Sequence, residues 1–226
     1  MKSDKLTAMG SVEPKRRYDD ACGTAHALEL IGDRWTLLVL RELMLGGRRF
    51  SELRGDLPGI SANVLTQRLA ELEERGLVAR KRLPPPASVQ VYEATEWGLE
   101  AEPIVQSLGR WAARSPGHDP TLPLSGVSMM LSLGTMFDAD RARKFDARVG
   151  FLFGRDRYLA RVKKGRFRVT RGDIDGADVV FSGPPTAMAA VVYGGAAMDL
   201  MGVTGDRALA ERFVTLFPLP AKVGAT

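Results

Sequence analysis

Apolar residues recur at helical spacing through the first half of the chain, in short segments that glycine and proline separate. Ala25–Ile31 and Trp35–Leu45 predict two helices, and the second is apolar almost all round, which indicates a buried helix. The segment SELRGDL predicts a third, short helix, which Ser51 caps and Pro58 ends. These elements predict a small helical domain.

A fourth helix is predicted for SANVLTQRLAELEERG, which Ser61 caps and Gly76 ends. Leu65, Leu69 and Leu72 share one face of this helix, because residues three and four apart lie on the same side. We expect that face to pack on the core, which leaves the opposite, polar face to solvent.

Strand patterns follow on both sides of a run of three prolines. Leu77–Leu83 and Val89–Ala94 predict two strands, and Glu96–Arg114 predicts a final helix that carries Trp97, Ile104, Leu108 and Trp111. The order of helix, short helix, turn, capped helix and two-stranded hairpin is typical of a winged helix-turn-helix, in which the capped helix enters the major groove of DNA.

The polar face of the fourth helix carries residues that can bind base edges. With the leucines facing inward, a step of about 100° per residue places Asn63 and Gln67 opposite the core. Asn and Gln side chains can bond bidentately to adenine, and Arg68 at the flank can reach guanine or phosphate. The hydroxyls of Ser61 and Thr66 suit phosphate oxygens. These residues predict the base-reading surface of a DNA-binding helix.

Basic residues flank this helix in the sequence. Three cations follow one another on the predicted hairpin, where they would lie along a phosphate backbone or a minor groove, and a further pair precedes the third helix. The alternative, that these polar faces are only solvated, stays open at this point. The predicted DNA-contacting residues are Arg48, Arg49, Ser51, Ser61, Asn63, Thr66, Gln67, Arg68, Arg80, Lys81 and Arg82.

The net charge of +5 on 226 residues suggests an acidic partner, but the charge is unevenly distributed. Residues 1–115 hold 17 Lys and Arg against 16 Asp and Glu, whereas residues 116–226 hold 15 against 11. A nucleic-acid surface in the first half must therefore be a local patch.

Few residues are available for metal or nucleophilic chemistry. With Cys22 as the single cysteine and two histidines, an intrachain disulfide is excluded and a zinc site would lack ligands. No set of nucleophile, base and orienting group is visible, so we expect no enzyme, no catalytic residue, no metal and no cofactor. No apolar run reaches about 18 residues and the polar N-terminus is no signal peptide, so we expect a cytoplasmic protein without membrane insertion.

The second half combines strand patterns with helices of small residues. Tyr158–Lys164 and Arg166–Arg171 predict a hairpin that turns at Gly165, with basic residues on one face and apolar residues on the other. Residues 141–171 hold 12 Lys and Arg against two Asp. Such a basic face either protects a sheet edge in solvent or adds a contact to DNA.

Methionine is concentrated in the second half, where six of the nine lie between residues 129 and 201. Methionine adapts to irregular apolar shapes, so this interior suits a cavity for an apolar ligand, and an ordinary core is an equally open alternative. The predicted ligand-contacting residues are Met129, Leu133, Met136, Met188, Val192, Met198 and Met201.

The stretch SPGHDP at residues 115–120 predicts a linker, because it has two prolines and a glycine in six residues. We therefore expect a flexible segment over residues 1–20, a DNA-binding domain over 21–114, and a second domain over 121–226.

Residues 22–112 resemble the HxlR-type family of bacterial and archaeal transcription regulators. The resemblance rests on the Cys22 start, the LIGDRW-TLLVLREL block, RRFSELR, LPGIS, the LTQRL-ELEERGLV helix and the Y-x-x-T-x-x-G ending. It implies a winged-helix homodimer that binds an inverted repeat, with dimer contacts from the first and last helices. Gly23 stands where many members carry proline, which weakens a redox role inferred from the cysteine.

Cys22 is nevertheless a candidate redox sensor. A sensor thiol is exposed and has a lowered pKa near cations or a helix N-terminus. Cys22 stands at the start of a predicted helix, which lowers the pKa of its thiol, whereas Asp19 and Asp20 would raise it. The alternative is a small buried hydrophobic residue.

Residues 121–217 resemble the sterol-carrier-protein type domain, most clearly over 177–217. There a strand ending in glycine, a helix, a short loop, the V-x-G-D strand and a terminal helix follow in order. This resemblance implies an α/β domain with an apolar cavity for lipid-like molecules and no required catalysis.

These patterns together predict an α+β protein with an N-terminal winged helix-turn-helix domain followed by an α/β sterol-carrier-like domain for ligand sensing or dimer support. The predicted function is a homodimeric transcription regulator that binds double-stranded DNA at an inverted-repeat operator, with an apolar or lipid-like small molecule as effector. The alternative is a carrier of an apolar ligand that uses the winged helix for protein contacts. That alternative predicts ligand binding without salt-dependent DNA affinity.

Overall fold

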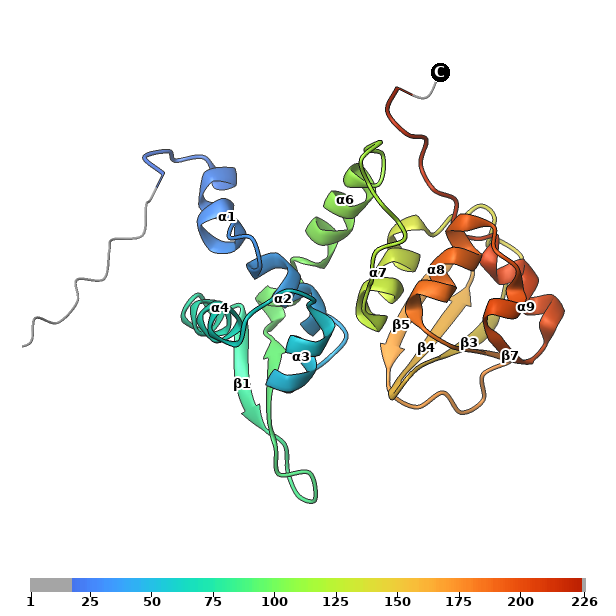
Figure 1. The fold of residues 1–226 in the computed structure, drawn as a ribbon, viewed down its shortest axis with the longest axis horizontal. Coiled ribbons are helices and arrows are strands. Elements are labelled where there is room, and N and C mark those ends of the chain that lie inside the picture. The colour runs from blue at the N-terminus through green and yellow to red at the C-terminus, as the bar shows by residue number, and fades with distance from the viewer. Residues whose placement is uncertain (1–17, 225–226) are drawn as a thin grey trace, which may run out of the picture.

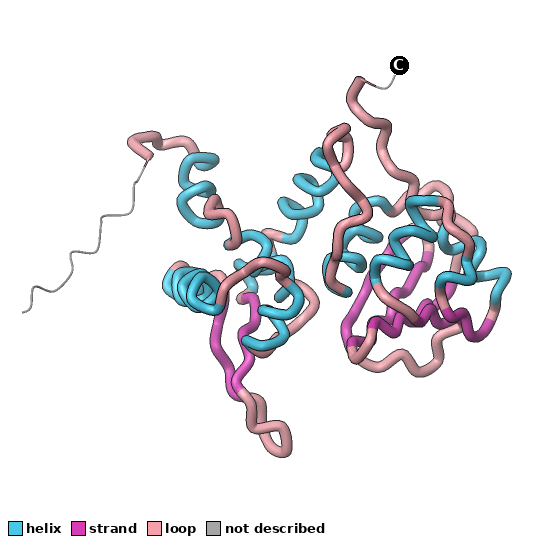
Figure 2. Tube along the Cα trace, in the orientation of Figure 1, coloured by secondary structure: helices cyan, strands magenta, loops and turns pink. Residues whose placement is uncertain are grey.

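The computed structural model describes residues 18–224 and has two parts (Figures 1 and 2). The first part contains helices and a two-stranded hairpin, and the second contains a five-stranded sheet with helices on one face. The α+β class predicted from the sequence is confirmed. The segment predicted to be flexible covers residues 1–20, and residues 1–17 of it lie outside the described residues.

The first part is held together by α2 (Thr36–Leu43) and α4 (Ala62–Glu74), which pack against each other through buried leucines such as Leu40, Leu65 and Leu69. Its other elements are α1 (Gly23–Ile31), α3 (Phe50–Asp56), β1 (Val78–Arg82), β2 (Gln90–Ala94), α5 (Glu96–Leu99) and α6 (Glu102–Ala112). The strands β1 and β2 pair antiparallel, with Val78 opposite Ala94 and Arg82 opposite Gln90. The predicted order of four helices followed by two strands is confirmed by α1 to α4, β1 and β2.

Two details of the first part differ from the sequence-based expectation. The helix predicted over residues 96–114 is divided into α5 and α6, because Pro103 has no N–H to donate to the preceding turn and its ring would clash there. Ser51 does not cap α3. That helix begins at Phe50, and the Glu52 carboxylate accepts a hydrogen bond from the Arg49 backbone N–H at 2.9 Å.

The second part follows an exposed, irregular stretch at residues 115–120 and begins with α7 (Gly126–Met136). Its strands, in sheet order, are β5 (Arg166–Arg171), β4 (Asp156–Lys163), β3 (Ala147–Phe153), β6 (Val179–Ser182) and β7 (Gly202–Gly205). The pair β3–β6 is parallel and the other pairs are antiparallel. The remaining elements are α8 (Pro185–Gly194), the 3₁₀ turn η1 (Met198–Leu200) and α9 (Arg207–Val214).

The predicted hairpin of the second half is confirmed as β4 and β5. Lys164 and Gly165 form its turn with positive φ angles of 51° and 68°, which suit a tight two-residue connection. The order of strand, helix, loop, strand and helix predicted over residues 177–217 is also present, as β6, α8, η1, β7 and α9. Membership of the sterol-carrier-protein type stays a prediction.

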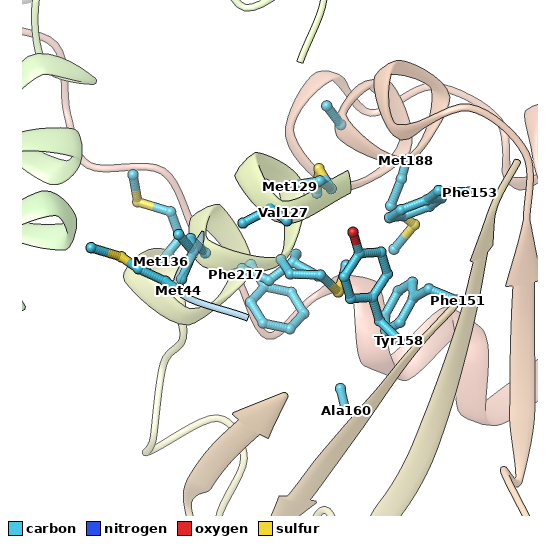
Figure 3. Packing of buried hydrophobic residues seen from close by; sticks show 14 of the residues in the cluster. Met44, Val127, Met129, Met136, Phe151, Phe153, Tyr158, Ala160, Met188 and Phe217 are labelled. Atoms are coloured by element: carbon cyan, nitrogen blue, oxygen red, sulfur yellow. The ribbon is translucent and has the colours of Figure 1, made fainter. Parts of the chain in front are cut away.

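Aromatic and methionine side chains form the core between the sheet and its helices (Figure 3). The Phe151 ring stacks on that of Phe181 at a centroid distance of 5.7 Å, and both contact the Phe213 ring at 5.9 Å. The buried residues of both parts belong to one continuous cluster, and α6 packs against α7 where the two parts meet. The two parts are therefore joined by packing as well as by the chain.

No helix within residues 18–224 is both long enough and apolar enough to cross a membrane, since the longest, α4, has 13 residues. The same residues contain no cluster of three or more His, Cys, Asp or Glu side chains that could hold a metal ion.

Candidate nucleic-acid interface

Helix α4 presents a polar face to solvent because its apolar face is anchored in the core. Leu65, Leu69 and Leu72 are at most 1% exposed. The Ser61 hydroxyl accepts a hydrogen bond from the Val64 backbone N–H at 3.2 Å, which caps the helix as predicted. The helix is therefore held at one end and along one side.

The predicted base-reading residues lie on this exposed face. Asn63, Thr66 and Gln67 are all exposed. The Thr66 hydroxyl donates to the Ala62 carbonyl oxygen at 2.9 Å, so its hydrogen is used within the helix. The Gln67 amide donates to the Glu71 carboxylate at 3.1 Å, and it must exchange that bond for one to a base. Of the two amide side chains, that of Gln67 is hydrogen-bonded within the helix, whereas no residue within 18–224 hydrogen-bonds to the side chain of Asn63.

Arg68 is held against the protein more firmly than the sequence suggested. Its side chain is 14% exposed, and its guanidinium forms ion pairs with Asp33 at 2.5 Å and Glu71 at 2.8 Å. These two carboxylates neutralise its charge and link α4 to the turn before α2. A positioning role for Arg68 is therefore better supported than a direct contact to guanine.

The β1–β2 hairpin presents the predicted cations at the surface. Arg80 pairs with Glu73 of α4 at 2.7 Å, and its guanidinium lies over the Tyr92 ring at 5.4 Å from the centroid. Lys81 pairs with Glu93 at 2.6 Å. Arg82 is exposed, and no carboxylate of residues 18–224 lies within 4.0 Å of it. The Arg80–Glu73 pair fixes the hairpin to α4.

The same hairpin forms a hollow of about 380 Å³ that is open to solvent. Its lining residues are Arg80, Lys81, Arg82, Ser88 and Gln90. A concave surface with three cations is suited to the phosphate groups along one strand of a duplex.

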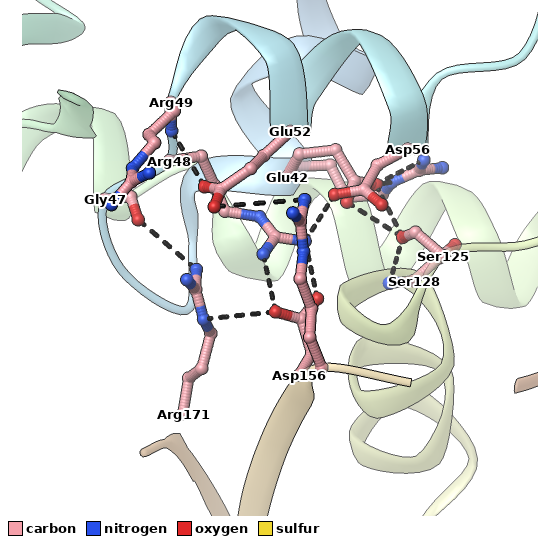
Figure 4. A network of polar contacts seen from close by, with 12 residues as sticks. Glu42, Gly47, Arg48, Arg49, Glu52, Asp56, Ser125, Ser128, Asp156 and Arg171 are labelled. Atoms are coloured by element: carbon pink, nitrogen blue, oxygen red, sulfur yellow. Dashed lines mark hydrogen bonds and ion pairs between the residues drawn. The ribbon is translucent and has the colours of Figure 1, made fainter. Parts of the chain in front are cut away.

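The structure corrects the assignment of Arg48 as a phosphate contact, because its side chain is only 1% exposed (Figure 4). Its two terminal nitrogens donate to the two carboxylate oxygens of Asp156, both at 2.9 Å, and one of them also donates to Asp56. Asp156 is the first residue of β4, so this ion pair joins the two parts of the molecule. Arg49 and Ser51, by contrast, are exposed as expected.

Two further polar contacts surround this junction (Figure 4). Arg171, the last residue of β5, donates to the Gly47 carbonyl oxygen at 3.2 Å. The Ser125 hydroxyl caps α7 and lies 2.8 and 2.9 Å from the two carboxylate oxygens of the buried Glu42. We define Glu42, Arg48, Ser125, Asp156 and Arg171 as the junction network. One sign of this network was present in the sequence. Glu42 stands within the apolar helix TLLVLREL, and a carboxylate that is buried there needs polar partners.

Burial and charge shift the pKa values of two of these carboxyl groups in opposite directions. Burial raises the pKa of Glu42, although the charge of Arg41 and the hydrogen bonds from Ser125 and Arg41 oppose that effect. Burial also acts to raise the pKa of Asp156, but the hydrogen bonds and charge of Arg48 outweigh it and hold the pKa below its usual value. Arg48 therefore keeps Asp156 ionised.

Cys22 is exposed and immediately precedes α1. Hydrogen bonds from the Thr24 backbone and side chain, and from the Ala25 backbone, lower the pKa of its thiol. The neighbouring Asp20 carboxylate instead accepts the Cys22 backbone N–H at 2.9 Å. The alternative of a buried cysteine is wrong, and the redox role stays a prediction.

The predicted ligand-contacting residues lie in the packed core of the second part. Met129, Leu133 and Met188 have no exposed surface, so in this structure they line no space that would admit a water molecule. Met201 is 3% exposed, and Val192 and Met198 are partly buried. This packing matches the alternative of an ordinary core.

Met136 also lines an open hollow of about 440 Å³ between the end of α7, α6 and the C-terminal segment. The other lining residues are Arg110, Phe137, Asp138, Ala139, Asp140, Pro218, Leu219 and Pro220. Five of these eight positions are charged or exposed, so the hollow differs from the enclosed apolar cavity that the sequence suggested.

The helices, the capped α4 and the cationic hairpin define a winged helix-turn-helix, a class of DNA-binding domain. Residues 30–119 match the family described as HxlR-like helix-turn-helix. The HTH-type transcriptional regulator YkvN of Bacillus subtilis, described as uncharacterized, is 43% identical over 94 residues, which are 40% of this chain and 77% of that protein. The chain belongs to the HxlR-like helix-turn-helix family.

A second relative by sequence agrees with this assignment. The HTH-type transcriptional regulator YodB of Bacillus subtilis is 37% identical over 86 residues, which cover 38% of this chain and 77% of YodB. The structure of reduced YodB aligns at 34% identity with a TM-score of 0.39, over 43% of this chain and 98% of that one. Both YkvN and YodB are described as HTH-type transcriptional regulators, and the family match ends before α7.

Proposed function

We propose that the protein is a homodimeric transcription regulator that binds an inverted-repeat DNA operator with α4 in the major groove and the β1–β2 hairpin on the backbone. The observation that carries the proposal is the surface formed by the exposed face of α4 and the hairpin that Arg80 and Glu73 fix beside it. Asn63 and Gln67 would read base edges, and Lys81 and Arg82 would neutralise phosphates.

The dimer is supported by apolar side chains that the chain leaves uncovered on α1 and α6. Ile104, Leu108 and Trp111 are 48%, 45% and 74% exposed, and their spacing places them on one face of α6. Leu28 of α1 is 50% exposed. An apolar patch of this kind marks an interaction site, and a second copy of the chain would bury it in a symmetric pair of helices.

The operator is found by sequencing the genomic DNA that is cross-linked to the protein in cells. Purified protein should then bind the recovered site with an affinity that falls steeply with salt concentration. If no genomic site is enriched in the cross-linked DNA, or if the affinity of the purified protein for DNA does not depend on salt, a DNA-binding function is contradicted and the carrier alternative is favoured.

The dimer has its own test in analytical ultracentrifugation. The variant Leu108→Glu should be monomeric, because dimerisation would bury the two introduced carboxylates close to each other without a positively charged partner. The matched control is Leu200→Glu, since Leu200 is similarly exposed at 55% but lies in the second part. A dimeric Leu108→Glu protein would place the interface elsewhere.

We also propose, from the methionine-rich core, that an apolar effector binds the second part by displacing Met129 and Met188. Because these side chains are fully packed, binding requires the core to open and should show a large negative heat-capacity change. Native mass spectrometry and calorimetry against fatty acids and isoprenoids test this, and Met188→Trp should block binding without changing DNA affinity. Absence of binding across the panel leaves the second part without an effector role.

A further inference from the structure

Exposed cations gather on two strands of the second part's sheet, β4 and β5, on the face that no helix packs against. On β4 the side chains of Tyr158, Ala160 and Val162 are buried beneath the helices, and the alternate residues are exposed. β5 follows the same alternation. We define the basic sheet face as the exposed cations of these two strands, Arg157, Arg161, Lys163, Arg166 and Arg168.

The strand register places like charges directly opposite each other on this face. Arg148 of β3 is opposite Arg161 of β4, and Arg161 is in turn opposite Arg168 of β5. Lys163 is opposite Arg166. Directly opposed side chains on one face lie about 5 Å apart at Cβ, and like charges at that separation destabilise a sheet. The arrangement therefore costs stability unless an anion lies against it.

Carboxylates of the protein neutralise only part of this charge. Lys163 pairs with Asp146 at 3.4 Å, and Arg148 donates to the Asp175 carbonyl oxygen at 2.7 Å. Among residues 18–224, no carboxylate lies within 4.0 Å of the guanidinium groups of the four arginines of the basic sheet face. These four positive charges are available to a partner.

Protection of a sheet edge does not account for the position of these charges. Basic residues on an edge strand prevent pairing with another sheet, and β5 is such an edge. β4, however, is paired on both sides, with β3 and β5. Arg157 and Arg161 therefore need another explanation.

The junction network holds the basic sheet face in a fixed position relative to α4. Asp156 and Arg171, at adjacent ends of β4 and β5, bond to Arg48 and Gly47 of the first part (Figure 4). In Figure 1 the helices of the second part lie above the sheet, and the β1–β2 hairpin extends downward, toward the side that the helices leave uncovered. The hairpin and the basic sheet face are thus directed to the same side.

We propose that the basic sheet face binds the DNA phosphate backbone outside the half-site that α4 occupies. This proposal rests on the proposed function. DNA is favoured over an acidic protein because none of the large apolar side chains that are exposed in residues 18–224 lies on β4 or β5. Protein interfaces have an apolar core, whereas phosphate contacts need only regularly placed cations.

The test uses the full chain and two duplexes, the operator trimmed to its half-sites and the same operator lengthened by about one helical turn, or 10 bp, on each side. The test variant is Arg161→Gln with Arg168→Gln. Its matched control is Arg207→Gln with Arg212→Gln, which removes two charges from α9 on the opposite face of the sheet.

On the long duplex, the test variant should bind more weakly than wild type, and the slope of log affinity against log salt should become shallower by about four units for the dimer, because two phosphate contacts are lost in each of its two protomers. On the short duplex it should match wild type, and the control should match wild type on both. The test variant should unfold at or above the wild-type midpoint at low salt, since removal of opposed charges relieves repulsion.

The outcomes separate this inference from the proposed function. Wild-type protein that binds neither duplex contradicts the proposed function itself. Wild-type binding that is equal on both lengths, or a test variant that retains the wild-type salt slope on the long duplex, overturns the inference and leaves the proposed function intact. A test variant that binds DNA normally but loses an acidic protein partner also overturns it.

Discussion

Arg48 and Arg82 lie in the same half of the chain, and both belong to runs of basic residues, but their surroundings are opposite. Arg48 is buried between the carboxylates of Asp56 and Asp156, whereas Arg82 is exposed at the end of β1. A buried charge must be paired, and an exposed charge is free to meet a partner. Similar runs of basic residues therefore serve different purposes in this protein. Arg48 joins the two parts of the molecule, and Arg82 faces outward.

The largest effect is expected from removing the buried charge. Arg48→Ala should lower the free energy of unfolding by about 3–5 kcal/mol, because it leaves Asp156 buried without its partner. Chemical denaturation measures this, with Arg49→Ala, at the exposed neighbouring position, expected to stay within about 0.5 kcal/mol. An Arg48→Ala protein with unchanged stability and weaker DNA binding would restore Arg48 as a DNA contact.

A second prediction concerns another bond across the junction. Ser125→Ala removes the hydrogen bond that the hydroxyl donates to the buried Glu42 carboxylate and leaves that carboxylate with the hydrogen bonds from Arg41. It should cost about 1–3 kcal/mol in the free energy of unfolding. Ser107→Ala, at an exposed position on α6, is the control and should have little effect. If both variants unfold alike, the hydrogen bonds from Arg41 are sufficient for Glu42, and the Ser125 contact contributes little to the junction.

The exposed surface should affect DNA binding and not stability. Asn63→Ala should cost about 1–3 kcal/mol on the operator and little on random DNA, because it removes a base contact. Lys81→Ala should weaken binding to both and make the salt slope shallower by about one unit for each protomer of the bound protein. Fluorescence anisotropy on both DNAs measures these effects. Equal losses on both DNAs for Asn63→Ala would show that α4 does not read bases.

The pH dependence of stability should report the buried carboxyl group. The pKa of Glu42 is raised in the folded protein, so the folded state binds a proton that the unfolded state releases near pH 4.5. Its contribution is therefore present at low pH and is lost as the pH rises through the raised pKa. Glu42→Gln should abolish this decrease in the free energy of unfolding above about pH 4.5. A decrease that persists in the variant would assign it to another group.

The smallest effect on stability is expected at the exposed thiol. Cys22→Ser should change the free energy of unfolding by less than about 0.5 kcal/mol, because the side chain is fully exposed. Because hydrogen bonds lower its pKa, the native thiol should be alkylated faster at neutral pH than the same thiol in the unfolded chain. Slower alkylation in the native protein would exclude a sensing role.

Local patterns in the sequence were sufficient for the helices, the hairpins and the exposed face of α4. The leucine stripe, the Ser61 cap and the turn at Gly165 each involve residues close along the chain, and the structure confirms all three. Asn63, Gln67 and Arg82 are exposed for the same reason. Their direction follows from helical or strand periodicity once the buried face is known.

The burial of particular polar residues could not be predicted from local patterns. Arg48 and Asp156 are 108 positions apart, and so local spacing carries no information about their contact. The ion pairs of Arg68, the hydrogen bond of Ser125 and the burial of the methionines depend in the same way on which elements pack against each other. The local elements and the outward face of α4 can be read from neighbouring residues, because helical and strand periodicity acts over short distances along the chain. The junction and the packed core cannot be read in this way, because their contacts join residues that are far apart in the sequence.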